Sequence, residues 1–194
     1  YSGIDIRQEQ VDSNREQAMD ILPIENQPQW YVGDSNELLN DNWNTKFDMV
    51  MSCPPYADLE VYSDKKEDLS NMSYKDFITV YREIIRKTCS LLKEDRFAVF
   101  VVCDVRDKKG FYQNFVSDTI QAFIDSGVPL YNEMILVNMI GNLAMRAGKY
   151  FNGGRKIGKQ HQNVLVFYKG NPKNIKANYP ELDLSYMQEE IIME

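Results

Sequence analysis

The stretch FDMVMSCPPYADLEVYSD, residues 47–64, contains the transition that decides how the chain folds. Residues 47–52 are mainly apolar and predict a buried β-strand that ends just before Pro54 and Pro55. Because proline has a fixed φ and no backbone N–H, two in succession cannot continue a strand. The sequence therefore predicts a stiff hook, residues 53–56, directly after the carboxyl end of a strand.

Length and composition limit the possible folds and the possible cellular compartments of the protein. The chain has 194 residues, 43% of them hydrophobic, which is enough to bury one sizeable core. No segment approaches the roughly 20 uninterrupted apolar residues of a membrane helix, and no basic-then-apolar leader precedes the first residues. The three cysteines, Cys53, Cys89 and Cys103, lack metal-ligand spacing. We therefore expect a cytoplasmic protein with no metal site and no membrane association.

Apolar periodicity predicts strands that alternate with helices. Strands are expected over residues 1–6, 30–34, 47–52, 96–105, 131–140 and 162–169, and helices over 7–21, 73–92 and 111–127, with a helical turn capped by Ser35. Ser73 and Asp76 form a capping-box variant, and Gly127 ends a helix. Apolar strands separated by helices are typical of a doubly wound sheet with helices on both faces. The predicted fold is α/β, with a mostly parallel sheet and an antiparallel final strand pair.

Two acidic residues follow strands of this predicted sheet. Asp5 ends the first strand, and Asp34 follows the second. Ligands of doubly wound sheets bind at the carboxyl ends of the strands, where a carboxylate can accept hydrogen bonds from ribose hydroxyls or from an adenine amino group. Each acid alone is equally well explained as a helix cap or turn residue. Together with the hook, the two acids favour a nucleotide site.

These residues carry a family resemblance. The motifs GIDI (residues 3–6), GDS (33–35) and CPPY (53–56), in this order, resemble the S-adenosylmethionine-dependent amino-methyltransferases of DNA. The longer stretches YSGIDIRQEQVDSN, WYVGDSNELL, SCPPYADLEVYSD and KQHQNVLVFYKG are similar to phage and prophage DNA modification methylases. The resemblance extends to about Gly170. It implies a Rossmann-like catalytic domain over residues 1–170 and a C-terminal extension over 171–194, whose last ten residues suggest a short acidic helix.

The resemblance also implies roles for individual residues. It assigns Asp5 to the ribose of S-adenosylmethionine, and Asp34, with Ser35 in the same motif, to the adenine amino group of that cofactor. The hook, Cys53, Pro54, Pro55 and Tyr56, would hold the target base. The exocyclic amino group of adenine or cytosine is a poor nucleophile, so acceptors such as the Pro54 carbonyl must engage its N–H groups. Tyr56 would stack on the flipped base.

The sequence departs from the family in two places. Cys53 stands where the family has Asp, Asn or Ser, and a thiol is a weak acceptor. A cysteine nucleophile would follow a proline, whereas Cys53 precedes two. The family's glycine-rich first motif is absent, and Tyr1 already lies in a strand-like run, so we expect an N-terminally truncated domain. Adenine N6 and cytosine N4 both remain possible targets, as do a catalytically incompetent nucleic-acid-binding relic and an RNA or protein amide methyltransferase.

Basic residues are concentrated in one segment. Between Glu133 and Glu181 lie eight basic residues and no acidic ones; the formal net charge of the chain is −7, so the rest of the chain sums to −15. This asymmetry favours a polyanionic partner over a merely solvated surface. We expect a flexible, glycine-rich loop that binds DNA phosphates through five cations: Arg146, Lys149, Arg155, Lys156 and Lys159. His161, the only histidine, is interpreted as a residue that starts a strand.

Overall fold

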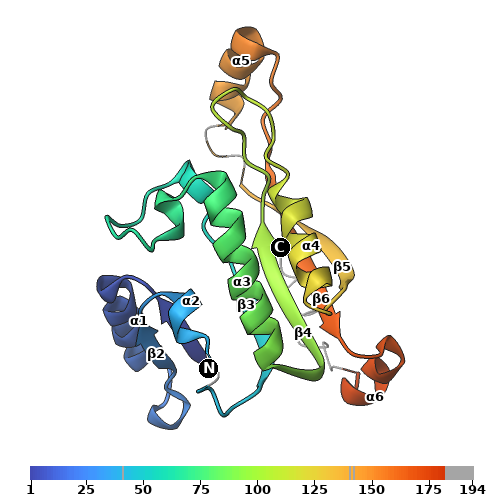
Figure 1. The fold of residues 1–194 in the computed structure, drawn as a ribbon. Coiled ribbons are helices and arrows are strands. Elements are labelled where there is room, and N and C mark those ends of the chain that lie inside the picture. Colours follow the sequence, from blue (N-terminus) through green and yellow to red (C-terminus); the bar gives the residue numbers. More distant parts are fainter. Residues whose placement is uncertain (41, 140, 142, 182–194) are drawn as a thin grey trace, which may run out of the picture.

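The computed structural model describes residues 1–181 except 41, 140 and 142, and these residues form alternating strands and helices (Figure 1). The strands are β1 (Ser2–Asp5), β2 (Gln29–Val32), β3 (Phe47–Ser52), β4 (Leu92–Val102), β5 (Leu130–Val137) and β6 (His161–Lys169). The α-helices are α1 (Gln8–Ile21), α2 (Ser35–Leu38), α3 (Tyr74–Leu91), α4 (Phe115–Asp125), α5 (Leu143–Gly154) and α6 (Ile175–Asn178). The predicted α/β class is confirmed, and β6 begins at His161 as the sequence indicates.

The strands pair into two sheets where the sequence predicts one. β1 pairs in parallel with β2, and a separate sheet has the order β3-β4-β6-β5. Within this second sheet β3 and β4 are parallel, while β6 is antiparallel to both β4 and β5. The expected antiparallel final pair is therefore present. The parallel part of the fold is divided between the two sheets.

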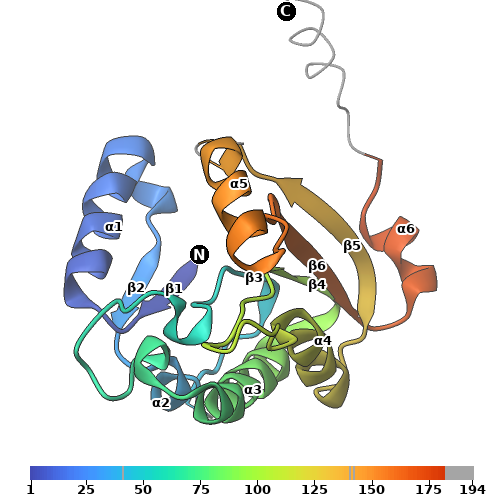
Figure 2. The ribbon, with the colours of Figure 1, turned by 90° about the horizontal axis from the view of Figure 1, so that it is seen from above.

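The helices cover the two sheets unequally. α2, α3 and α4 lie on one side of the molecule, whereas α1 lies on the other side against β1 and β2 (Figure 2). Met49 and Met51 of β3 are 54% and 62% exposed, so this strand is covered on one face rather than buried as predicted. The expectation of helices on both faces is met at β1 and β2 and not at β3.

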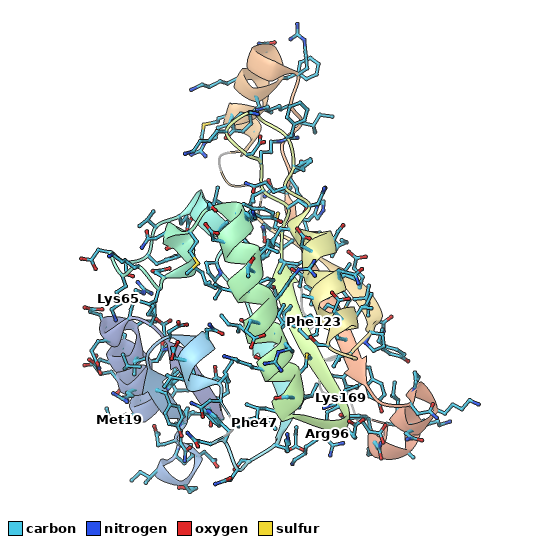
Figure 3. All side chains as sticks on the ribbon, viewed as in Figure 1. Met19, Phe47, Lys65, Arg96, Phe123 and Lys169 are labelled. Carbon is cyan, nitrogen blue, oxygen red and sulfur yellow. The ribbon has the colours of Figure 1, made fainter. Side chains whose placement is uncertain are left out.

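Aromatic side chains fill the core between the four-stranded sheet and helices α3 and α4. Phe123 of α4, labelled in Figure 3, stacks on Phe167 of β6 with ring centroids 3.8 Å apart. Phe77 stacks on Tyr81 one turn along α3 with ring centroids 5.4 Å apart. All four side chains are at most 2% exposed. Burial of this much apolar surface is the main stabilising contribution, and it fixes α3 and α4 against the sheet.

Helix ends follow local chemistry, with two corrections. The Oγ of Ser73 accepts from the backbone N–H of Asp76, as the capping box predicts, and Gly127 ends α4 with φ +77°. α2, however, is capped by Asp34 and not by Ser35. α4 begins at residue 115 rather than 111, because the preceding residues 111–113 form backbone hydrogen bonds with residues 105–107.

The first part of the expected C-terminal extension packs against the sheet. Asn171 and Asn174 both donate hydrogen bonds to the Asp95 carboxylate, and the Tyr179 hydroxyl donates to the Asp95 carbonyl oxygen. The predicted acidic helix, residues 185–194, lies outside the described residues. None of the described helices has the length and apolar character needed to cross a membrane. A domain boundary at residue 170 stays a prediction.

We predict that Ser73→Ala lowers the free energy of unfolding by about 1 kcal/mol, because an orphan N–H of α3 loses its acceptor. Ser90→Ala, which changes an exposed serine inside the last turn of the same helix, should change that free energy by less than about 0.5 kcal/mol. Urea unfolding of the three proteins measures the difference. Equal stabilities for the two variants would show that the cap does not stabilise α3.

Candidate functional site

The carboxyl ends of β1, β2 and β3 meet at one cavity. The cavity has a volume of about 540 Å³ and lies between β1 and β3, with Tyr81, Ile84 and Thr88 of α3 along one side. Six of the residues that the sequence singles out line it: Asp5, Asp34, Ser35, Cys53, Pro54 and Pro55. Residues that are up to 50 positions apart in the sequence therefore share one pocket. Its volume falls within the usual range of small-molecule sites, about 300–1,000 Å³.

The side chain of Asp5, at the end of β1, is held by contacts with Arg7. Its Oδ1 accepts from the Arg7 N–H at 2.8 Å, and the Arg7 Nε lies 3.8 Å from the same oxygen. Among the described residues, the hydrogen bonds of Asp5 involve Oδ1 alone, so Oδ2 keeps its acceptor capacity. The Asp5 side chain is 33% exposed, which leaves it accessible from the cavity.

Asp34, which follows the neighbouring strand β2, likewise uses one carboxylate oxygen for a nearby backbone N–H. Its Oδ1 accepts from the Asn36 N–H at 2.8 Å and caps α2. The interpretation of Asp34 as a helix cap is therefore correct, but it uses one carboxylate oxygen only. Within the described part of the chain, Oδ2 of Asp34 has no hydrogen-bond donor, so this carboxylate can still accept from a ligand.

Tyr56 is fixed from two sides although it does not line the cavity itself. Its ring packs edge-on against Phe115 with centroids 5.9 Å apart, and Gln162 of β6 donates its Nε2–H to the Tyr56 hydroxyl at 2.7 Å. Burial raises the pKa of Tyr56, and the hydrogen bond from Gln162 lowers it in part. The hydroxyl therefore stays protonated at neutral pH, and the ring at the end of the hook has a defined orientation.

A loop over residues 57–71 forms the outer wall of the cavity. Asp68 of this loop is 4% exposed, and it accepts from the hydroxyls of Ser63 and Ser70 and from the Ser70 N–H. Burial favours a higher pKa for Asp68, but the three donors outweigh it and hold the pKa below its usual value. At the far end of the loop, Lys65 donates to the carbonyl oxygen of Ile6 just past β1 (Figure 3). The loop thus connects the two sides of the cavity.

The first part of the basic segment is a helix where the sequence predicts a flexible loop, and the rest, residues 155–159, has no regular structure. Arg146 and Lys149 lie on α5, and Arg155, Lys156 and Lys159 follow it. In Figure 1, α5 projects beyond the edge of the sheet at which β3 and β4 end. None of the five cations forms an ion pair with a carboxylate among the described residues. They form a group separate from the cavity residues.

Sequence reasoning missed Gln162 and Asp68. Gln162 is 106 residues from Tyr56 in the sequence. It lies in a predicted strand, and the alternation along a strand indicates which sheet face a side chain occupies but not which residue it contacts. Asp68 has a local signal in retrospect, since Asp followed two residues later by Ser is a turn pattern in which the carboxylate accepts from the backbone. Its burial depends on Ser63 and could not be read from that pattern.

The sequence matches no protein-family model and no curated protein sequence. The fold is similar to solved methyltransferases. TTHA0409, a candidate DNA modification methylase from Thermus thermophilus, in complex with S-adenosyl-L-methionine, aligns with TM-score 0.52 and 17% identity over 81% of this chain and 57% of that one. Magnesium protoporphyrin IX methyltransferase of Synechocystis PCC 6803 with bound SAH gives 0.53 and 14% over 87% and 63%. The chain thus spans less than two thirds of either protein. At these identities the comparison establishes the Rossmann-like methyltransferase fold.

We predict that Asp68→Asn lowers the free energy of unfolding at pH 7 by about 1–3 kcal/mol, because charge-assisted hydrogen bonds are lost. The pKa of Asp68 is lower in the folded state than in the unfolded state, so its contribution is present above pH ~4 and is lost as the pH falls through the folded value. Urea unfolding between pH 7 and pH 3 should show a shallower acid loss in Asp68→Asn than in the wild type.

Glu67→Gln is the matched control, since Glu67 is the exposed neighbour of Asp68. It should change stability by less than about 0.5 kcal/mol. If Asp68→Asn kept the acid loss of the wild type, the loop would not depend on this carboxylate.

Proposed function

We propose that residues 1–194 belong to an S-adenosylmethionine-dependent methyltransferase that modifies an exocyclic amino group in DNA, adenine N6 or cytosine N4. The observation that carries the proposal is the convergence of Asp5, Asp34 and the first three residues of the hook, 53–55, on one cavity at the carboxyl ends of the strands. The methyltransferase fold supports the cofactor class. The hook and the basic helix α5 support the substrate class.

The two carboxylates fit the nucleoside part of the cofactor. Each uses Oδ1 for a local backbone N–H and keeps Oδ2 available, and both face the same cavity. Ribose hydroxyls and the adenine amino group are hydrogen-bond donors, which such oxygens accept. We assign Asp5 to the ribose, and Asp34 with Ser35 to the adenine. When bound, S-adenosylmethionine would supply an electrophilic methyl group.

The hook presents acceptors and a ring to the target base. Pro54 and Pro55 line the cavity and carry no N–H, so their carbonyl groups are the hydrogen-bonding groups of that backbone. The Pro54 carbonyl would accept from the amino group of the base and favour a pyramidal nitrogen with an available lone pair. Tyr56, oriented by Phe115 and Gln162, would stack on the flipped base. Positioning and preorganised acceptors provide the catalysis.

Cys53 limits what the chemistry can be. Its side chain is exposed and lies at the rim of the cavity, ahead of both prolines. A thiol is a weak acceptor, so the backbone carbonyls carry the interaction with the amino group. Methyl transfer to an amino nitrogen requires no covalent nucleophile, and we assign Cys53 none.

The cations of α5 and the segment after it would hold the DNA backbone. The segment contains Arg146, Lys149, Arg155, Lys156 and Lys159, and four of these five side chains are exposed, Lys159 being half-buried. Phosphate contacts of this type orient a duplex without reading its sequence. Since the remainder of the chain is acidic, these few cations would account for most of the attraction to DNA.

We predict that Tyr56→Ala and Pro54→Ala lower kcat/KM for methyl transfer to DNA roughly 5- to 150-fold, the equivalent of losing about 1–3 kcal/mol of base stacking or positioning. Cys53→Ser should keep or raise the activity, and Cys53→Ala should keep a substantial part. Transfer of a labelled methyl group to DNA, RNA and protein acceptors in parallel measures these effects and separates the substrate classes.

Wild-type turnover in Tyr56→Ala and Pro54→Ala would contradict the role of the hook. Complete loss in both Cys53 variants, with folding intact by circular dichroism, would mean that the thiol itself reacts. Preferred labelling of RNA or protein would replace DNA as the substrate.

We also predict that replacing Arg155 and Lys156 by Ala weakens DNA binding to a similar extent across sequences. The slope of log K against log salt should fall by up to about two units, because each phosphate contact contributes roughly 0.9. Replacing Lys173 and Lys176, which lie in and before α6 away from α5 (Figure 1), is the control of equal charge and should leave the slope unchanged. Equal effects of the two double variants would mean that Arg155 and Lys156 are only part of a solvated surface.

A further inference from the structure

The segment between β4 and α4 contains a tight turn, residues 106–112, which we call the β4–α4 turn. Arg106 and Tyr112 form an antiparallel bridge at its base. Asp107 donates its backbone N–H to the Phe111 carbonyl oxygen at 2.8 Å, and its carboxylate accepts from the Phe111 N–H at 2.9 Å. The Arg106 guanidinium donates to the Gly110 carbonyl oxygen at 2.7 Å. The turn therefore has one defined shape.

This turn presents two cations and an aromatic ring to the solvent. Lys108 and Lys109 are exposed, and Phe111 is 71% exposed. In the part of the chain that the structure describes, neither lysine forms an ion pair. The one acid of the turn, Asp107, is half-buried and accepts from the Phe111 N–H. Cations beside an exposed ring are the chemistry that holds a polynucleotide, because cations contact phosphates and a ring stacks on a base.

The end of α5, residues 149–156, lies against the β4–α4 turn. The Lys156 Nζ is 2.9 Å from the point at which a Cβ of Gly110 would stand, so the Lys156 side chain reaches the turn. Figure 1 shows that the segment before α4 and α5 both extend beyond the end of the sheet. Lys149 and Lys156 are exposed. The two segments thus form one surface, although about 40 residues separate them in the sequence.

An arginine lies over an aromatic ring in each of the two segments. The guanidinium carbon of Arg106 is 3.8 Å from the centroid of the Tyr112 ring, and that of Arg155 is 5.2 Å from the centroid of the Phe151 ring. Tyr112 and Phe151 are 43% and 51% exposed, so both rings remain partly open to solvent. Positive charge and aromatic rings therefore alternate across the surface.

Both segments lead to the residues that orient Tyr56. Phe115, which packs on the Tyr56 ring, begins α4 three residues after the turn. Gln162, which donates to the Tyr56 hydroxyl, follows Lys156 by six residues. The surface is therefore anchored by the two residues that fix the ring of the hook.

We propose that the β4–α4 turn and the end of α5 form the binding surface for an unpaired DNA strand. Lys108, Lys109 and Lys156 contact its phosphates, and one base stacks on Phe111. The identity of this partner rests on the proposed function. The inference adds a segment outside the five cations named there, and it makes single-stranded or locally melted DNA the preferred substrate. Neighbouring bases cover the faces of each base in a duplex, whereas an unpaired base offers its face to a ring.

Binding of labelled DNA oligonucleotides to residues 1–194, measured by fluorescence anisotropy without S-adenosylmethionine, tests the role of Phe111. Phe111→Ala should weaken binding of a single strand roughly 5- to 150-fold, the usual effect of removing one stacking ring. Binding of an abasic strand of the same length should not change, because that strand has no base to stack. Phe111→Trp should bind the single strand like the wild type. Equal melting temperatures of the three proteins check that the fold is intact.

Replacing Lys108 and Lys109 by Ala tests the phosphate contacts. Binding of the normal and the abasic strand should weaken alike, and the slope of log K against log salt should fall by up to about 1.4 units, since each contact to a single strand contributes roughly 0.7. The control of equal charge, Lys173 and Lys176 replaced by Ala, should leave the slope unchanged.

Three results would overturn the inference: duplex binding by the wild type as tight as its single-strand binding, no loss in Phe111→Ala, or equal losses on the normal and abasic strands. Tighter binding of an RNA strand of the same sequence would exclude DNA as the partner. A methyl-transfer assay separates the two proposals. Transfer to DNA with unchanged binding in Phe111→Ala refutes this surface alone, whereas Phe111-dependent binding without any transfer refutes the proposed function alone.

Discussion

The parallel pairing of β1 with β2 and of β3 with β4 is the constraint on which the rest of the structure depends. Parallel strands that share one direction bring their carboxyl ends to one edge, and every polar residue that follows a strand lies at that edge. Asp5, Asp34 and Pro54 therefore meet at one cavity although other elements separate them in sequence. The two prolines fix the position at which β3 ends, because neither has a backbone N–H to donate to a neighbouring strand.

The same pairing leaves the molecule with an asymmetric site. The side that would receive a target base is built from residues fixed by the core, since Tyr56 contacts Phe115 and accepts a hydrogen bond from Gln162. The side that would receive a nucleoside opens into the space between β1 and β3, where α3 is the floor and neither strand edge is paired. The proposed methyl transfer would require both sides, and the carboxylates of Asp5 and Asp34 lie in the same cavity as Pro54 and Pro55.

Local chemistry explains what the sequence could predict. The proline stop, the Ser73 cap and the apolar period of α3 each depend on a few neighbouring residues, and the structure agrees with them. Features that depend on residues distant in the sequence could not be predicted from it. Examples are the exposure of Met49, which follows from an uncovered sheet face, and the hydrogen bond between Gln162 and Tyr56. The glycines of the basic segment predict a loop, whereas the apolar residues among them give residues 143–154 a helical period.

In the proposed function, the hook after β3 would present an exocyclic amino group of DNA for methylation. The most direct measurement is the mass of the nucleosides released from DNA that the protein has treated with S-adenosylmethionine. We expect one added methyl group on the amino nitrogen of deoxyadenosine or of deoxycytidine. Methyl groups on cytosine C5, or on RNA or protein while DNA stays unmodified, would contradict it.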